Sequence, residues 1–140
     1  MRFGFGKSSV QIVSDYVASI NARDLEQVEA LLADDARLVD SGGQEVAGHQ
    51  SCIDLIKRAW ACIPDYQLHI ESMHARGNEV LLRGHVEGGP MHGNPSQFRA
   101  VVEDRRVTSW ETFSAHTVSV IDWINAEAER SGNQCGSLSA

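Results

Sequence analysis

The apolar residues of this 140-residue chain change their spacing once, from a helical period to a strand period. In the first half they recur every three or four positions, in segments that begin at Ser9, Asp24 and Ser51. In the second half, apolar and polar residues alternate in segments separated by turn-forming sequences, near 66–74, 79–87, 97–103 and 106–114. Helices followed by antiparallel hairpins predict an α+β domain, with the helices packed on one face of a curved sheet.

Local signals refine the helix starts and add two elements. Asp24 followed by Gln27, and Ser51 followed by Asp54, have the spacing of capping boxes, so the second and third helices are expected to begin there. A short strand is expected over 36–40, between these two helices. A terminal helix is indicated by one further apolar series, Val118, Ile121, Ile124 and Ala128.

Length and charge narrow the class of protein. The chain fits one domain over 1–140, ordered over about 8–130, with flexible tails over 1–7 and 131–140. The net charge is -7 and no basic run is present, so neither nucleic acid nor an anionic membrane is an expected partner. The longest apolar runs are too short to span a bilayer, and the first residues do not resemble a signal peptide. We therefore expect a cytoplasmic protein.

The cysteines argue against both a disulfide framework and a metal site. Cys52, Cys62 and Cys135 are odd in number and lack a C-x-x-C spacing. The histidines show no paired ligand spacing either. We expect reduced thiols and no bound metal.

Asp40 is the most informative polar residue of the first half. It shares its side of the short strand with Ala36 and Leu38, because alternate residues of a strand face the same way. An unpaired carboxylate in an apolar wall costs several kcal/mol. If Asp40 is a functional carboxylate in a cavity, Asp40→Asn is expected to be neutral or stabilising at neutral pH. If Asp40 caps the following Ser-Gly-Gly turn, the same change is expected to cost stability.

Tyr16 flanks the apolar stripe of the first helix. It lies four residues from both Ile12 and Ile20, so its ring adjoins the buried side of that helix. Its hydroxyl is expected either to enter a cavity or to bond a partner in the core.

Together these residues resemble a known family. The run YVASINARDLEQVEALLADDARLVDSGG, which begins at Tyr16, is similar to the opening of ketosteroid isomerases in the NTF2-like superfamily, which also contains the SnoaL-like polyketide cyclases. The shared pattern is a tyrosine-bearing helix, an N-x-x-D-L turn, an A-D-D-A helix end and a strand-end aspartate. It matches over residues 16–42, and later strands resemble the family less specifically.

The resemblance implies a fold and a chemistry. A bent sheet would wrap the long helix into a cone and enclose a mostly apolar pocket. Asp40 would be the base that moves a proton beside a carbonyl, and Tyr16 would donate a hydrogen bond to the enolate oxygen, without a cofactor. The family has a second donor, a protonated aspartate in the penultimate strand. Here Gln97 or Phe98 falls at that place, and no carboxylate is available.

Other candidate site residues follow from the expected strands. The pocket is expected around Tyr16, Asp40, Leu82, Val86 and Trp110, with Trp60, Gln97 and Phe98 as further substrate contacts. On the 66–74 strand, Tyr66 and Leu68 share one face and His69 lies on the other. If the polar face lines the pocket, His69 is a candidate acid or base partner. The pattern alone does not decide between the two faces.

The leading functional hypothesis is an isomerase-like enzyme that transfers a proton next to a carbonyl of a hydrophobic, steroid-like or polyketide-like substrate. One alternative is a SnoaL-like cyclase, dehydratase or epoxide hydrolase. Another is a non-catalytic binding or dimerisation module, because the same fold serves that use. We also expect a homodimer, since helices cover only one face of the sheet.

Overall fold

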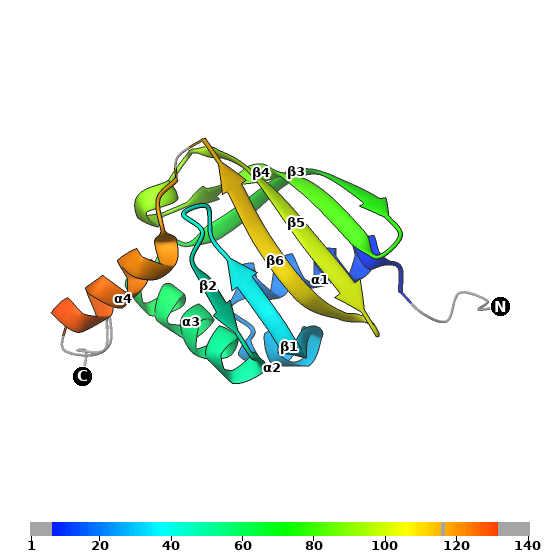
Figure 1. Ribbon diagram of the computed structural model, residues 1–140, viewed down its shortest axis with the longest axis horizontal. Helices are drawn as coiled ribbons and strands as arrows, with labels where there is room; N and C mark the ends of the chain where they lie inside the picture. The colour runs from blue at the N-terminus through cyan, green and yellow to red at the C-terminus, as the bar shows by residue number, and fades with distance from the viewer. Residues whose placement is uncertain (1–6, 116, 132–140) are drawn as a thin grey trace.

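The computed structural model describes residues 7–115 and 117–131, which form four α-helices and a six-stranded mixed sheet that does not close into a barrel (Figure 1). The elements follow in the order α1 (Ser9–Ala22), α2 (Leu25–Leu31), β1 (Leu32–Val39), β2 (Glu45–Ala47), α3 (His49–Cys62), β3 (Gln67–Arg76), β4 (Glu79–Glu87), the 3-10 turn η1 (Gly89–Met91), β5 (Pro95–Glu103), β6 (Arg106–Ser114) and α4 (Val120–Arg130).

The strand order places the two halves of the chain side by side. The sheet runs β2-β1-β6-β5-β4-β3, and every neighbouring pair is antiparallel except β1 and β6. The parallel pairing sets Leu38 opposite Trp110, so the strand that leads to Asp40 lies against the last strand. The α+β class and the order of helices before hairpins are confirmed.

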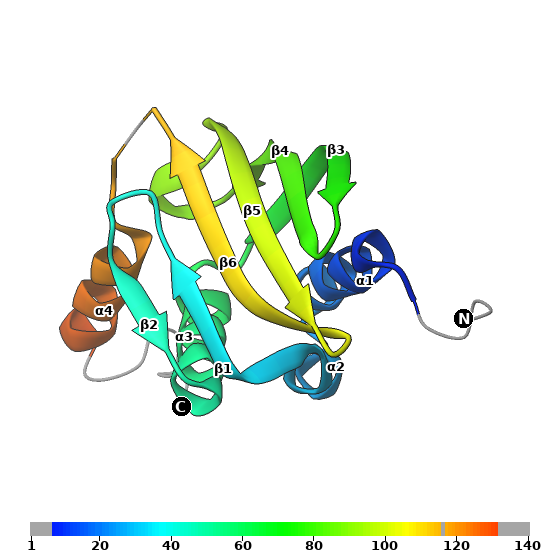
Figure 2. The ribbon, with the colours of Figure 1, turned by 45° about the vertical axis from the view of Figure 1, so that its right-hand side comes forward.

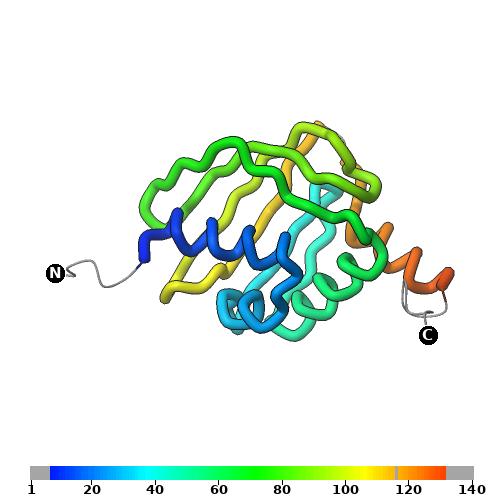
Figure 3. The backbone as a smooth tube through the Cα atoms, turned by 180° about the vertical axis from the view of Figure 1, so that it is seen from behind, coloured from blue at the N-terminus to red at the C-terminus, as the bar shows by residue number. Residues whose placement is uncertain are grey.

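The helices cover the inner face of the bent sheet. Figures 2 and 3 show α1, α2 and α3 on one side of the strands, with α4 at one end of the molecule. The apolar stripe of α1 packs into the core, where Val13, Val17 and Ile20 are buried. The alternation of β4 has the same cause, since Val80, Leu82 and other alternate residues face the helices.

The predicted helix starts differ in outcome. Asp24 caps α2 as predicted, because its side chain accepts a hydrogen bond from the Gln27 N–H at 3.2 Å. The predicted start at Ser51 is wrong, because α3 begins at His49, directly after Gly48. Gly48 has a φ of 98° and donates its N–H to a β1 carbonyl, so the chain turns from the sheet into the helix without a side-chain cap.

The structure also bears on the expectations for the cysteines, for the ends of the chain and for membrane-spanning segments. Cys52 is a free, buried thiol, whereas Cys62 is disulfide-bonded, so the expectation of reduced thiols is wrong at Cys62. Cysteine spacing in the sequence does not reveal pairs that only the folded chain brings together. The expected flexible tails lie almost wholly outside the described residues. No helix in the described part of the chain has the length and apolar character needed to cross a bilayer.

Candidate functional site

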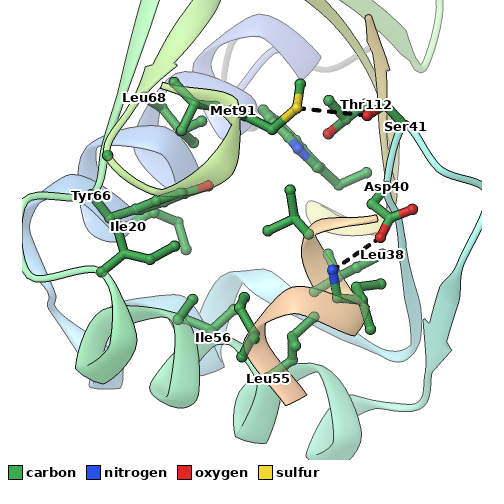
Figure 4. Close-up of a pocket in the computed structure, with 18 of the residues that line it drawn as sticks. Ile20, Leu38, Asp40, Ser41, Leu55, Ile56, Tyr66, Leu68, Met91 and Thr112 are labelled. Carbon is green, nitrogen blue, oxygen red and sulfur yellow. Dashed lines mark hydrogen bonds between the residues drawn. The ribbon is translucent and has the colours of Figure 1, made fainter. Parts of the chain in front are cut away.

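A pocket opens between the inner face of the sheet, α3, η1 and α4 (Figure 4). Most of its lining side chains are apolar or aromatic, and they come from both halves of the chain. Six of the candidate residues from the sequence line this pocket: Tyr16, Asp40, Trp60, Val86, Phe98 and Trp110. The core cluster surrounds this pocket, so the space lies within the packed part of the domain.

Three aromatic rings form one wall. The Trp110 ring lies 5.6 Å from the Tyr16 ring and 5.2 Å from the Phe98 ring, centroid to centroid, in tilted arrangements. The pairing register of β5 and β6 brings Trp110 and Phe98 together, because Trp110 pairs with Ala100, two residues beyond Phe98. Tilted aromatic contacts of this kind give a rigid apolar surface.

The place expected for the second acid is apolar. Phe98 faces the pocket and is 1% exposed, whereas Gln97 faces the opposite side of the sheet and is exposed. The expectation that Gln97 contacts substrate in this pocket is therefore not met, because neighbouring residues of a strand face opposite sides. β5 contributes a ring at this position and no hydrogen-bond donor from its side chains.

Tyr16 brings a hydroxyl to the pocket from α1. The residue is 3% exposed, and burial, together with the nearby Tyr66, raises the pKa of Tyr16 well above its ordinary value. The phenol therefore remains protonated and can donate. Among the described residues, no side chain or backbone group forms a hydrogen bond with this hydroxyl.

Asp40 lies at the pocket wall beside α4, at the end of β1 (Figure 4). Its Oδ1 accepts the backbone N–H groups of Gly42 and Gln44, both at 2.9 Å. Its Oδ2 accepts the Ser119 hydroxyl at 2.7 Å and the Ile121 N–H at 3.0 Å. The carboxylate thus caps the turn after β1 and also lines the pocket. The turn-capping hypothesis and the cavity hypothesis for Asp40 each describe part of its environment.

The start of α4 completes the site. Ser119 is the N-cap of α4, since its Oγ accepts the Asp122 N–H at 3.0 Å while its hydroxyl donates to Asp40. Gly42 permits this close approach, because a Cβ there would lie 2.8 Å from the Ser119 nitrogen. The sequence stripe that predicted the helix includes Ile121, which lines the pocket, but the pattern did not indicate the contact with Asp40.

His69 lies outside the pocket. Its Nε2 is 2.7 Å from Glu87 Oε1, and its ring stacks on His85 at 4.8 Å, on the outer face of the sheet. The hydrogen bond from His69 is the main cause that lowers the pKa of Glu87. The apolar face of β3 points inward instead, so Leu68 lines the pocket together with Tyr66 from the turn before the strand. His69 is therefore not placed to act as an acid or base on a ligand in this pocket.

Two other candidate residues have different surroundings. Leu82 is 1% exposed and belongs to the packed core, not to the pocket lining. Trp60 does line the pocket, and its indole Nε1 is buried without a hydrogen-bond partner in the described part of the chain. Across residues 7–115 and 117–131, no group of three His, Cys, Asp or Glu side chains is arranged as metal ligands would be.

A bent mixed sheet that holds a helix against its inner face, with a pocket between them, defines the NTF2-like or cystatin-like α+β fold. Residues 13–110 match the SnoaL-like domain family, and the chain belongs to that family. No functionally curated protein matches the chain.

Solved structures with the same fold come from several bacteria. One is an uncharacterised cystatin-fold protein from Novosphingobium aromaticivorans, with 22% identity, a TM-score of 0.68, and coverage of 77% of this chain and 99% of that one. An LEH-like epoxide hydrolase from M. tuberculosis has 21% identity and a TM-score of 0.66, covering 76% and 77% of the two chains. A protein with a ketosteroid isomerase-like fold from Catenulispora acidiphila has 19% identity and a TM-score of 0.64, covering 79% and 88%.

Proposed function

We propose that this protein is a cofactor-free enzyme that moves a proton next to a carbonyl of a hydrophobic, polycyclic small molecule. The observation that carries the proposal is that the Asp40 carboxylate and the Tyr16 phenol line one pocket whose other lining residues are mostly apolar, and that the phenol has no hydrogen-bond partner among residues 7–115 and 117–131. An apolar pocket suits a hydrophobic substrate, and the two polar groups supply a base and an oxyanion donor. Membership of the SnoaL-like family supports this class of chemistry.

The reaction needs a free lone pair on Asp40. A carboxylate has about four acceptor sites, and four donors already occupy those of Asp40. Three of these donors are backbone N–H groups, whereas the fourth is the Ser119 hydroxyl, which can rotate about its side-chain bonds. In the proposed mechanism Ser119 turns away, and Oδ2 takes the proton from the carbon beside the carbonyl. The bonding electrons move to the carbonyl oxygen, which receives the Tyr16 hydrogen bond, and the proton then returns to another carbon.

A second candidate function is non-catalytic binding of a hydrophobic small molecule. The same four hydrogen bonds favour it, because they leave no acceptor site of the carboxylate free to take a proton from a carbon acid. In this case Asp40 holds α4 against the pocket, and the pocket acts as a receptor.

Turnover of a β,γ-unsaturated ketosteroid separates the two functions. For an enzyme, Asp40→Asn abolishes turnover and leaves affinity nearly unchanged, since the base acts on the transition state. Tyr16→Phe lowers turnover on the order of 10²–10³-fold, as expected for loss of one oxyanion donor. The matched control is Asp35→Asn, an exposed carboxylate outside the pocket. Equal background rates in all variants would refute the enzymatic proposal, and tight binding without turnover would favour the receptor.

A further inference from the structure

The pocket has a second tyrosine whose role the sequence did not indicate. Tyr66 lies in the turn before β3, and Figure 4 shows its side chain among the lining residues with the hydroxyl directed toward the middle of the pocket. In the described part of the chain this hydroxyl has no hydrogen-bond partner. It lies near enough to Tyr16 to affect the ionisation of that phenol.

The end of α1 holds the backbone of this turn in place. Arg23, in the left-handed region at the C-cap of α1, donates to the carbonyl oxygens of Tyr66 at 3.1 Å, Ile63 at 3.3 Å and Pro64 at 2.8 Å. The Tyr66 N–H also donates to the Ile63 carbonyl at 3.0 Å. These bonds tie the turn to the same helix that carries Tyr16, so the two phenols keep a defined relation to each other.

Tyr66 is also held in the form that donates. Burial raises the pKa of Tyr66 to about 12, and Arg23 lowers it by a smaller amount. The hydroxyl therefore stays protonated across the range in which most enzymes work. Since β5 places Phe98 where the family has an acid, the pocket lacks a donor from that strand. Tyr66 is a polar side chain of the lining that is able to supply one from the turn before β3.

We propose that the Tyr66 hydroxyl is the second hydrogen-bond donor to the ligand oxygen that Tyr16 contacts, so that the pocket takes hydrophobic ketones and phenols. This inference rests on the proposed function for its catalytic part, because both donors would then stabilise the enolate. Its binding part does not depend on turnover, since a bound phenolate presents the same negative oxygen to the two hydroxyls.

The test uses the full chain and 2-naphthol, an aromatic phenol whose anion resembles a planar enolate. Affinity and the ionisation of bound naphthol are measured by fluorescence over pH 6 to 9, for wild type, Tyr16→Phe and Tyr66→Phe. We expect Tyr66→Phe to weaken binding about 10-fold to 100-fold, as for loss of one hydrogen bond to a charged group, and to raise the pKa of the bound naphthol. Ser9→Ala is the control, because it removes a hydroxyl that bonds Gly77 far from the pocket.

Ketosteroid turnover by the same variants separates this inference from the proposed function. If wild type shows no turnover but Tyr66→Phe still weakens naphthol binding, the proposed function fails and the assignment of Tyr66 holds. If wild type turns over substrate and Tyr66→Phe matches Ser9→Ala in both naphthol affinity and kcat, the assignment of Tyr66 is overturned. Failure of wild type to bind 2-naphthol would overturn it as well. Because phenylalanine keeps the ring, Tyr66→Phe is expected to fold, and circular dichroism checks that it does.

Discussion

Asp40 joins a structural and a chemical role in one side chain. Its two oxygens accept four hydrogen bonds, from the turn that follows β1 and from the start of α4, yet it still lines the pocket. The sequence hypothesis of an unpaired carboxylate in an apolar wall therefore does not describe its surroundings. Paired in this way, the carboxylate stabilises the fold around it.

We predict that Asp40→Asn destabilises the protein by about 1–3 kcal/mol. The amide NH₂ would face N–H or O–H groups whose hydrogen bonds the carboxylate now accepts, and two donors cannot bond each other. This reverses the neutral or stabilising effect expected for an unpaired carboxylate. Urea unfolding at pH 7 measures the difference, with Asp35→Asn as a control in which an exposed carboxylate changes in the same way. A stability equal to that of wild type would show that the four hydrogen bonds contribute little.

The phenols of the buried Tyr16 and the half-buried Tyr66 make stability depend on pH in the alkaline range. The pKa of Tyr66 is about 12, that of Tyr16 is raised further, and the unfolded value is near 10. Below pH 10 both states keep the protons, so the full stability is present. As pH rises from 10 to 12 the unfolded state loses protons that the folded state retains. Stability then falls by about 1.4 kcal/mol per pH unit for each tyrosine.

Urea unfolding at pH 9, 10 and 11 tests this dependence. We predict that Tyr16→Phe and Tyr66→Phe each flatten the alkaline loss of stability, since phenylalanine does not titrate. A slope that is the same in wild type and in both variants would mean that the phenols ionise as freely in the folded protein as in the unfolded one.

At the scale of the elements, α4 is attached to the sheet through its first turn. Ser119 links the helix to Asp40, and Val120, Ile121 and Ile124 line the pocket. The amphipathic pattern of this segment predicted a helix, but its place at the pocket depends on the β1 turn, where Gly42 leaves room for the Ser119 backbone.

We predict that Ser119→Ala destabilises the protein by about 0.5–2 kcal/mol, the usual range for loss of an N-cap. The loss should be local, so amide exchange should quicken in the first turn of α4 and less in the strands. Ser131→Ala is the matched control, because its hydroxyl bonds the Glu127 carbonyl at the far end of the same helix. Equal exchange rates in the two variants would contradict a special attachment at Ser119.

At the scale of the whole molecule, none of the helices in the described part of the chain covers the outer face of the sheet. Two large apolar side chains are exposed there, Leu81 at 46% and Phe113 at 50%. The charges between them are largely paired on the same face, where Glu111 bonds both Arg37 at 3.2 Å and Arg99 at 3.0 Å. A face with exposed apolar groups and paired charges is suited to association with a second copy.

We therefore propose a homodimer formed through this outer face. Static light scattering at high micromolar concentration should give twice the mass of the chain for wild type. Phe113→Glu should shift it to the monomer, because the interface would then bury a carboxylate that has no partner of opposite charge. Arg76→Gln, at the far end of β3, serves as the control. A monomeric wild type at that concentration would contradict the proposal.

The order of elements follows from the sequence alone, because hydrophobic periodicity reflects which face of each segment is buried. Val13 and Val17 mark the inner side of α1, and the alternation of β4 marks its inner side through Val80 and Leu82. The resemblance that begins at Tyr16 also indicated Tyr16 and Asp40, two of the polar residues that line the pocket. These features are local, or are carried by a contiguous run, and need no knowledge of neighbouring segments.

Only the tertiary structure decided which faces and which distant groups meet at the site. Periodicity separates the two sides of a strand without saying which side is inner, and only the fold shows that β3 presents Leu68 to the pocket and His69 to the outer face. Likewise Phe98, and not Gln97, faces inward. The Ser119 hydroxyl that donates to Asp40 lies 79 residues away along the chain. Such contacts depend on strand register and helix docking, which arise from the packing of the whole chain and leave no signal at a fixed spacing in the sequence.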